Sequence, residues 1–280
     1  MTAPLILEYL DQMNITEASD LYLTQGACPL LRVDNKLLPI GEHTLSAEKL
    51  LDMLTSFLTT RQMRYCESHK VLNTALYAGE HGRFRINVLR QRQAPAIVIR
   101  RIVSKIPSLK DLSLPDSLAN MALLKRGLIL VTGMTGSGKS TSLAAMLDYR
   151  NTKSQGHIIT IEDPIEYFHE HKASIVTQRE VGVDTDSYTV ALKNALRQRP
   201  DVILVGEIRD RDVMEQTVMA AETGDFCLAT LHTNNAYQAI ERVINFFPVD
   251  MHEQVPLYLA INLRALISQR LLPSLQSGMV

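Results

Sequence analysis

The stretch Gly133-Met-Thr-Gly-Ser-Gly-Lys-Ser140 decides the fold of this sequence. It matches the phosphate-binding pattern G-x-x-x-x-G-K-[ST] at every fixed position. The apolar run Leu128–Val131 precedes it, and a helix is predicted to begin near Lys139, which is the strand–loop–helix context that the pattern requires. A simple glycine-rich connection would seldom reproduce the whole pattern in that context, so we interpret the stretch as a nucleotide site.

Each part of this loop has a physical task. Glycines let the backbone amides turn toward the phosphates, and the first turn of the helix adds its positive end. We expect Lys139 to lie on a solvent-facing loop and to reach the β- and γ-phosphates of ATP, while the Ser140 hydroxyl ligates Mg²⁺. The expected nucleotide-binding residues are Gly133, Thr135, Gly136, Ser137, Gly138, Lys139, Ser140 and Thr141.

Outward from the loop, apolar runs alternate with helical stretches. The runs are Leu128–Val131, Ile158–Ile161, Val202–Val205 and Phe226–Thr230. Continuous runs of this kind, separated by helices, predict a mostly parallel sheet that is buried on both faces. We therefore expect an α/β domain over residues 125–280.

The first part of the chain has a different pattern. Ile6, Tyr9, Leu10 and Met13 fall at helical spacing, and Ser46 is a candidate N-cap for a helix that runs through Phe57. Short extended runs follow the pattern of strands, at Asp20–Thr24, Leu30–Val33, Lys36–Leu38, Val71–Tyr77, Arg83–Arg90 and Ala96–Ile102. These features predict a small α+β domain over residues 1–103. Prolines and serines in residues 104–124 predict a linker that ends in a short helix near Leu118–Leu124.

The composition suits two domains and excludes several classes of protein. The chain has 280 residues, 46% of them hydrophobic, and its 29 basic and 30 acidic side chains leave a net charge of -1. That balance offers no long-range attraction for nucleic acid. Cys28, Cys66 and Cys227 lack the paired spacing of a zinc site or a disulfide framework. No signal peptide and no apolar span of about 18 residues is evident, so we expect a cytoplasmic protein.

Two of the apolar runs lead into carboxylates. Val202–Val205 is followed by Glu207, and in P-loop folds such a strand holds its acid close to Mg²⁺. Ile158–Ile161 leads to Glu162, Asp163 and Glu166, one of which could orient and deprotonate the attacking water. A lone glutamate after a strand is usually a solvated loop charge. Two acidic strand ends beside a phosphate loop favour a catalytic role instead.

His232 follows the last of these runs, in Ala229-Thr-Leu-His-Thr-Asn234. A single histidine is usually a structural residue with satisfied hydrogen bonds. At the edge of this sheet His232 could instead donate a hydrogen bond to the γ-phosphate and report its loss. We carry it as a candidate catalytic residue.

Four segments together resemble the motifs of the secretion-type ATPases of type II secretion and type IV pili. These motifs, named Walker A, Asp box, Walker B and His box, correspond to Gly133–Ser140, Thr160–Tyr167, Leu204–Asp210 and Ala229–Asn234. Further segments resemble the type IV pilus retraction ATPases of the PilT/PilU family, and the PilU branch most. They are Ser19–Leu23, Gly82–Asn87, Ile99–Ile102, Ala144–Asn151, Arg179–Val183 and Ile244–Pro248. The resemblance covers nearly the whole chain.

The resemblance implies a PAS-like N-terminal domain, a RecA-like P-loop ATPase domain and a homo-oligomeric ring of six subunits. It implies docking on the inner-membrane platform protein of the pilus, at the cytoplasmic side of that membrane, and cooperation with a PilT-like partner ATPase. It also implies that Glu162 is the catalytic base and that Glu207 binds Mg²⁺ through water. Members of the family continue through a further helical region, so we expect the sequence to stop short of it at Val280.

A further departure from the family pattern lies within the sequence. Asp225 occupies a position where relatives more often carry histidine. The zinc-binding cysteine motif of many extension ATPases is absent, which favours retraction over assembly.

The family's paired arginines match Arg85 and Arg100, which are fifteen residues apart on neighbouring predicted strands. Arg100 and Arg101 point to opposite faces of a strand, so only one of them can aim at a common site, and the resemblance selects Arg100. The implied role is to stabilise charge on the γ-phosphoryl group. The alternative is a solvated strand face with ordinary surface arginines.

Three functions therefore compete. The first is an ATP-hydrolysing motor for pilus retraction. The second is a nucleotide-binding ring that supports a partner motor and hydrolyses little ATP itself. The third is a RecA-like nucleic-acid translocase, against which the neutral net charge and the lack of a basic stripe interleaved with aromatics both argue. The six arginines from Arg83 to Arg101 form the one local basic cluster.

Overall fold

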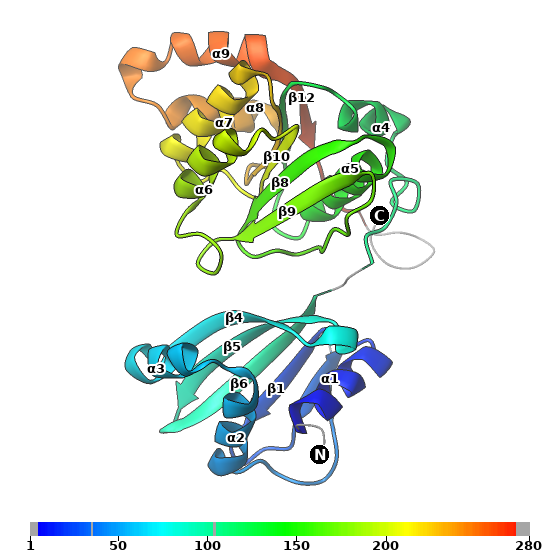
Figure 1. Ribbon diagram of the computed structural model, residues 1–280, viewed down its shortest axis with the longest axis vertical. Coiled ribbons are helices and arrows are strands. Elements are labelled where there is room, and N and C mark those ends of the chain that lie inside the picture. The colour runs from blue at the N-terminus through cyan, green and yellow to red at the C-terminus, as the bar shows by residue number, and fades with distance from the viewer. Residues whose placement is uncertain (1–4, 35, 103–104, 273–280) are drawn as a thin grey trace. The chain divides into compact units, whose positions relative to one another are not determined.

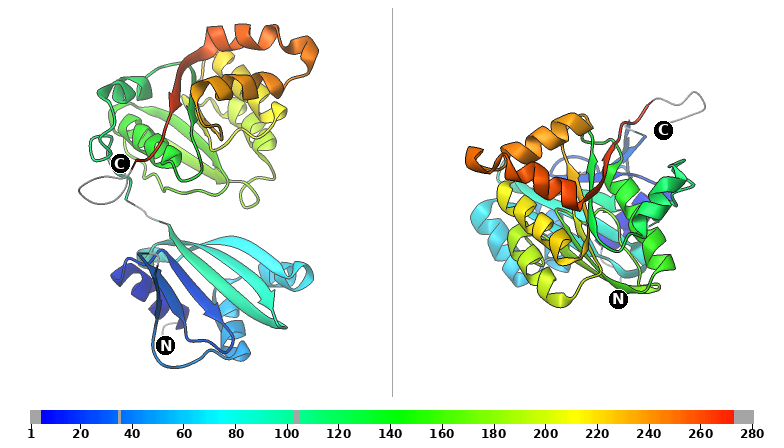
Figure 2. Two further views of the ribbon diagram at one scale, coloured as in Figure 1. Left: turned by 180° about the vertical axis from the view of Figure 1, so that it is seen from behind. Right: turned by 90° about the horizontal axis from the view of Figure 1, so that it is seen from above.

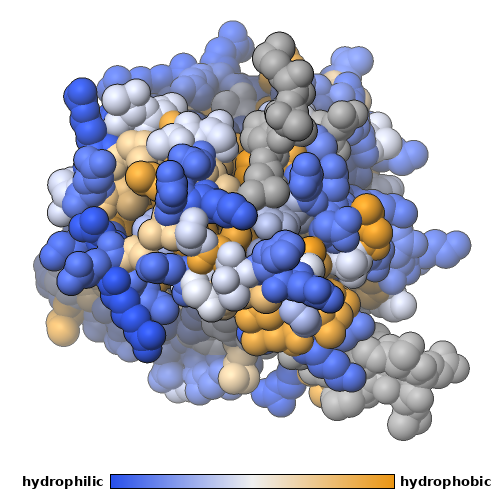
Figure 3. Space-filling view, turned by 90° about the horizontal axis from the view of Figure 1, so that it is seen from below, coloured by the Kyte–Doolittle hydropathy of each residue, from blue (hydrophilic) through white to orange (hydrophobic). Residues whose placement is uncertain are grey.

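The computed structural model describes residues 5–34, 36–102 and 105–272, and the chain divides into two compact units between Ser104 and Lys105 (Figure 1). Within the described residues we find no helix with the length and hydrophobicity that a bilayer crossing requires. The surface in Figure 3 is mostly hydrophilic, with hydrophobic patches of limited extent.

The first unit is an antiparallel sheet with helices on one face. Its described strands pair in the order β3-β2-β1-β6-β5-β4. They are β1 (Asp20–Thr24), β2 (Leu30–Val33), β3 (Lys36–Pro39), β4 (Val71–Tyr77), β5 (Arg83–Gln91) and β6 (Ala94–Ile102). The helices are α1 (Leu5–Ile15), α2 (Ala47–Phe57), α3 (Thr60–His69) and the short η1 (Gly79–His81).

The core of this unit lies on a single face of its sheet. Along β5, Phe84, Ile86 and Val88 are fully buried, and they pack in one cluster with Leu10 of α1 and Leu50 of α2. The alternate residues of the strand point to the opposite face, which contributes nothing to this core cluster. That second, open face carries Arg83 and Arg85 of β5.

The second unit is a parallel sheet covered on both faces. Its described strands pair in the order β12-β7-β11-β10-β8-β9, and every pairing is parallel. They are β7 (Gly127–Thr132), β8 (Gly156–Glu162), β9 (Ser174–Glu180), β10 (Val202–Val205), β11 (Phe226–Leu231) and β12 (Leu263–Ser268). The helices are α4 (Asp116–Ala122), α5 (Lys139–Lys153), α6 (Tyr188–Ala195), α7 (Arg211–Thr223), α8 (Ala236–Asn245) and α9 (Gln254–Asn262), with short η2 (Leu196–Gln198) and η3 (Val249–Met251).

Two hydrophobic clusters bury the two faces of this sheet. Leu128 and Leu130 of β7 pack with residues of α6, α7, α8 and α9. Ile129 and Val131 of the same strand pack with residues of α4 and α5. Figure 2 shows the two helical layers on either side of the strands. The predicted α/β fold with a parallel sheet buried on both faces is thereby confirmed.

The structure adds elements that the sequence analysis did not predict. Strands β9 and β12 are the edges of the parallel sheet, and their sequences mix charged residues with apolar ones. Edge strands are half-exposed, so they lack the continuous apolar run by which the central strands were found. Helix α3 has no buried residue in its span and therefore no apolar stripe to reveal it.

The segment from Lys105 to Leu124 packs onto the second unit. Leu109, Leu118 and Ala122 belong to the hydrophobic cluster on the α5 side of the sheet. Arg150, near the end of α5, is 7% exposed, and its Nη1 donates to the carbonyl oxygens of Ala122 at 2.9 Å and Leu124 at 2.6 Å. The end of α4 is therefore fastened to the helix that begins in the phosphate loop.

Removing this fastening should destabilise the second unit. We expect Arg150→Met to lower the free energy of unfolding by about 2–4 kcal/mol, because buried carbonyls that lose a donor keep their desolvation penalty. Urea unfolding of the purified protein would measure the change. Arg126→Met, at a nearby exposed arginine, is the control and should stay within about 0.5 kcal/mol of the parent. Equal effects of the two substitutions would contradict the role of Arg150.

Candidate functional site

A cleft of about 420 Å³ opens where the phosphate loop meets the carboxyl ends of β8, β10 and β11. Residues of all four predicted motif segments line it. They include Thr135, Gly136, Gly138, Lys139, Ser140, Thr141, Glu162, Asp163, Glu166, Tyr167, Glu207 and His232. The structure therefore brings together the sequence-predicted loop, both acidic strand ends and the histidine.

The phosphate loop connects β7 to α5 and needs glycine for two reasons. Gly138 has a φ of +84°, a left-handed conformation that other residues avoid. At Gly133 an added Cβ would lie 2.3 Å from the carbonyl oxygen of Gln269, so the chain that follows β12 leaves no room for a side chain. The end of β12 thus packs against the loop from behind.

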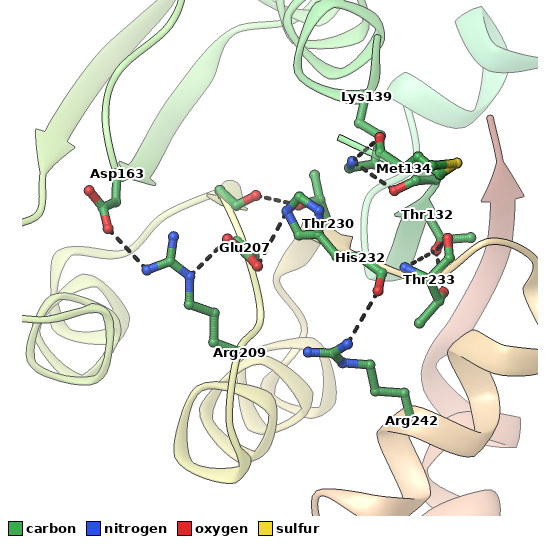
Figure 4. Close-up of polar contacts among 12 residues, drawn as sticks. Thr132, Met134, Lys139, Asp163, Glu207, Arg209, Thr230, His232, Thr233 and Arg242 are labelled. Atoms are coloured by element: carbon green, nitrogen blue, oxygen red, sulfur yellow. Dashed lines mark hydrogen bonds and ion pairs between the residues drawn. The ribbon is translucent and has the colours of Figure 1, made fainter. Parts of the chain in front are cut away.

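Lys139 is folded back against its own loop. It is the first residue of α5 and is 6% exposed, and its Nζ donates to the carbonyl oxygens of Gly133 at 2.9 Å and Met134 at 3.0 Å (Figure 4). Burial lowers the pKa of the Lys139 ammonium, while Glu207 and Glu166 act in the opposite direction. The expectation of a lysine on a solvent-facing loop was wrong, because two backbone carbonyls hold the ammonium inside the site.

Glu162 ends strand β8, and its half-buried side chain forms part of the wall of the cleft. Its Oε1 accepts hydrogen bonds from Thr160 Oγ1 at 2.6 Å and from Gln178 Nε2 at 3.3 Å. Burial raises the pKa of Glu162 to about 7, and the two hydrogen bonds only partly oppose that rise. A carboxyl group that titrates near neutral pH is suited to accept a proton during catalysis.

Both carboxylate oxygens of Glu207 are engaged by basic side chains. Oε2 accepts from Arg209 Nε at 2.8 Å, and Oε1 lies 3.3 Å from His232 Nε2. Arg209 also reaches Asp163, with 3.2 Å between Nη1 and Oδ2 (Figure 4). Since β8 and β10 are neighbouring parallel strands, Arg209 bridges their two acidic ends.

His232 lies at the edge of the sheet, in contact with Glu207. Burial lowers the pKa of its imidazole, and the Glu207 carboxylate opposes that shift. The next residue ties this loop to β7, because Thr132 Oγ1 donates to the carbonyl oxygen of Thr233 at 2.7 Å. The imidazole is therefore held between the Walker B carboxylate and the start of the phosphate loop.

Sequence reasoning missed three residues of this site. Arg209 was part of a quoted motif, two residues after Glu207, but no role was assigned to it. Gln178 of β9 donates to the carbonyl oxygen of Tyr167 at 2.8 Å as well as to Glu162. The Tyr167 hydroxyl in turn lies 2.9 Å from Thr141 Oγ1 on α5. These contacts join the acidic segment to β9 and to the helix that follows the phosphate loop, and they depend on the tertiary fold rather than on sequence spacing.

Arg85 and Arg100 belong to the first unit, whereas all the residues that line the cleft belong to the second. Arg85 of β5 and Arg100 of β6 are direct cross-strand partners in the antiparallel pairing. They therefore share the open face of the first sheet.

The residues of the cleft fit a magnesium nucleotide. Ser140 offers a hydroxyl and Glu207 a carboxylate, and oxygen ligands of this kind suit Mg²⁺. Mg²⁺ commonly takes one or two protein oxygens, with the remainder from water and substrate phosphates. The loop amides and Lys139 supply the donors that phosphates need.

The chain is similar to known proteins over nearly its whole length. The family described as "Type II/IV secretion system protein" matches residues 2–278. The type IV pilus ATPase PilU of Pseudomonas aeruginosa is 51% identical over 257 residues, which cover 91% of this chain and 67% of that protein. The type IV pilus retraction ATPase PilT of the same organism is 40% identical, covering 96% of this chain and 80% of PilT. A crystal structure of the pilus retraction motor PilT with bound ADP has a TM-score of 0.95 and 43% identity, covering 98% of this chain and 80% of that one.

The Glu162 carboxyl group should make the folded state less stable as the pH rises. Its folded pKa of about 7 lies above the ordinary value of 4.5. Between these values the folded state binds more protons than the unfolded state, so the free energy of unfolding falls as the pH rises through this window. The penalty is absent below the lower value and complete above the higher one, where it is on the order of 3 kcal/mol at about 1.4 kcal/mol per pKa unit.

Glu162→Gln tests whether the carboxyl group lowers the free energy of unfolding as the pH rises. The amide keeps the shape and can still accept from Thr160, but it never ionises. We expect the variant to gain up to about 3 kcal/mol over the parent at about pH 8 and much less at about pH 5, measured by urea unfolding. Glu170→Gln, at an exposed carboxylate of the following loop, is the matched control. A gain of the same size at both pH values would contradict the buried titration.

Proposed function

The chain belongs to the type II/IV secretion system protein family, and from this premise we propose that it is an ATP-hydrolysing motor for type IV pilus retraction. The observation that carries the proposal is the convergence of Glu162, Glu207 and His232 on a cleft that also contains a complete phosphate loop. The similarity of the chain to PilU and PilT supports the pilus as the site of action.

The cleft suggests how the work of hydrolysis is divided among its residues. The loop amides and Lys139 bind the phosphates, for which Lys139 must exchange its two carbonyl contacts for phosphate oxygens. Glu162, with a pKa of about 7, accepts the proton of the attacking water. Mg²⁺, held by Ser140 and through water by Glu207, would neutralise charge that develops on the phosphates. His232 reports the γ-phosphate to Glu207, its neighbour at 3.3 Å.

The proposed setting is a homohexameric ring at the cytoplasmic side of the inner membrane. The ring docks on the platform protein of the pilus base and acts as an accessory to a PilT-like partner ATPase, without nucleic acid. Arg85 and Arg100 complete the catalytic set by stabilising charge on the γ-phosphoryl group. Their shared strand face supports this role, since one site can then be reached by both.

A second function remains in competition: a nucleotide-binding ring that supports the partner motor and hydrolyses little ATP. The observation in its favour is that Lys139 and both oxygens of Glu207 are engaged by protein groups. Such contacts must break before a productive Mg²⁺–ATP complex can form. Measured turnover of the purified protein, alone and with the partner motor, separates the two functions.

Substitution of the two glutamates tests the motor. We expect Glu162→Gln to bind ATP normally and to lose about 10²–10⁴-fold in kcat, the usual contribution of general base catalysis. Glu207→Gln should also lose turnover, but with a weaker dependence of nucleotide affinity on Mg²⁺ concentration. Glu170→Gln serves as the control outside the cleft. If Glu162→Gln keeps most of the parental kcat, its role as the base is wrong.

Mixed rings test the two arginines. An arginine finger is worth about 10³–10⁵ in rate, so the Arg85→Ala/Arg100→Ala variant and the Lys139→Ala variant should each be nearly inactive alone. Arginine-deficient subunits keep intact phosphate loops, while Lys139→Ala subunits keep intact arginines. If the fingers act between subunits, mixtures should regain ATPase activity that neither variant shows. No recovery in mixtures shown by mass spectrometry to contain hybrid rings would count against action between subunits.

A further inference from the structure

A row of charged side chains crosses the open face of the first unit's sheet. In the strand register, Arg32 of β2 faces Asp20 of β1, Asp20 faces Arg100 of β6, and Arg100 faces Arg85 of β5. We call these four residues the charged row. It contains three arginines and one aspartate, so the row has an excess of positive charge.

This arrangement is unfavourable unless Asp20 compensates for it. Like charges directly opposite each other on neighbouring strands destabilise a sheet, as Arg85 and Arg100 are here. A buried carboxylate is also unfavourable unless it is paired, and Asp20 is only 4% exposed. Asp20 and Arg100 satisfy each other, and the structure accordingly keeps them in contact.

The contact fixes one edge of the Arg100 guanidinium. Arg100 Nε donates to Asp20 Oδ1 at 2.8 Å, and Ser19 Oγ donates to Asp20 Oδ2 at 2.8 Å. Arg32 is less closely engaged, since its Nε lies 4.0 Å from Asp20 Oδ2 and donates to the Tyr22 hydroxyl at 2.9 Å. The short ion pair of Asp20 is therefore the one with Arg100.

The exposures of the two partners differ sharply. The Asp20 side chain is 6% exposed, whereas the Arg100 side chain is 66% exposed. A guanidinium group held at Nε still has the donors of its two Nη groups, which form a fork that matches phosphate oxygens. Asp20 thus anchors the base of this fork at the sheet surface.

We propose that Asp20 is the positioning residue of Arg100: it holds the guanidinium through Nε so that the Nη fork is oriented for a γ-phosphoryl group. The inference rests on the proposed role of Arg100 in ATP hydrolysis. Preorganisation of this kind matters because a misplacement of about 1 Å in a catalytic group can reduce the rate about 10²-fold. Asp20 itself does not touch the nucleotide.

A purely structural role for Asp20 predicts a different outcome. If the carboxylate only offset the charge of the arginines, its loss would lower stability and leave turnover at saturating ATP unchanged. A positioning role lowers kcat, leaves the KM for ATP almost unchanged, and has no effect once Arg100 is absent. A double-mutant cycle on the full chain distinguishes these cases.

The cycle compares the parent, Asp20→Ala, Arg100→Ala and the double variant. We expect Arg100→Ala to lose about 10³-fold or more in kcat. Asp20→Ala should lose about 10–100-fold in kcat, and the double variant should be no slower than Arg100→Ala. Asp20→Asn should fall between the parent and Asp20→Ala, because a neutral amide oxygen accepts a weaker hydrogen bond than a carboxylate. If Asp20→Ala does not fold, Asp20→Asn is judged by the same criteria.

Two matched controls stay in the first unit. Asp11→Asn removes a carboxylate from a hydrogen bond away from the charged row, where Asp11 Oδ1 lies 2.5 Å from His81 Nδ1. Arg32→Gln changes the charge of the row without touching the bond between Asp20 and Arg100. Both should keep kcat within about twofold of the parent, since neither substitution removes a partner of the bond between Asp20 and Arg100. Thermal unfolding of every variant separates loss of fold from loss of rate.

Three results would overturn the positioning role of Asp20. Parental kcat in Asp20→Ala together with an impaired Arg100→Ala would overturn the positioning role and leave the arginine finger intact. A further loss in the double variant, equal to the loss in Asp20→Ala alone, would overturn it too, because Asp20 would then act independently of Arg100. Parental kcat in Arg100→Ala would overturn the finger, and the role of Asp20 with it.

Discussion

The parallel register of β7, β8, β10 and β11 is the constraint on which the rest of the site depends. Parallel strands end at the same edge of their sheet, so segments that are far apart in the chain meet there. The phosphate loop follows β7, Glu162 ends β8, Glu207 follows β10, and His232 follows β11. A shift of one residue in any of these pairings would turn one of these side chains toward the opposite face. Burial of both faces of the sheet makes such a shift unfavourable.

Two charged groups of the site, Glu162 and Lys139, lower the stability of the folded state because they are partly removed from water. The well-packed parallel sheet around them offsets this cost. Burial raises the pKa of Glu162 and lowers the pKa of Lys139, so both charged forms are disfavoured where they stand. The surrounding contacts relieve this only in part: Thr160 and Gln178 donate to Glu162, and two carbonyls receive Lys139. Functional sites commonly carry such unfavourable terms, which the remainder of the fold must offset.

The central strands, the loop and the acidic strand ends could be predicted because each is encoded by contiguous residues. The edge strands β9 and β12 could not, since half-exposed strands lose the apolar run. The position of Lys139 and the bridge made by Arg209 depend on side-chain contacts that spacing alone does not reveal. The pairing of Arg85 with Arg100 could have been predicted from the sequence, because two neighbouring strands joined by a short turn form an antiparallel pair. Asp20 comes from a strand about eighty residues away in sequence, and only the sheet order brings it there.

Arg150 connects the far end of helix α5 to the segment that contains α4. The helix has 15 residues and therefore spans about 22 Å, with Lys139 at its first position and Arg150 in its last turn. At the far end of the helix, Arg150 donates hydrogen bonds to the carbonyl oxygens of Ala122 and Leu124, at the end of α4 and just after it. The phosphate loop and the end of α4 are therefore the two ends of one continuous rod within the second unit.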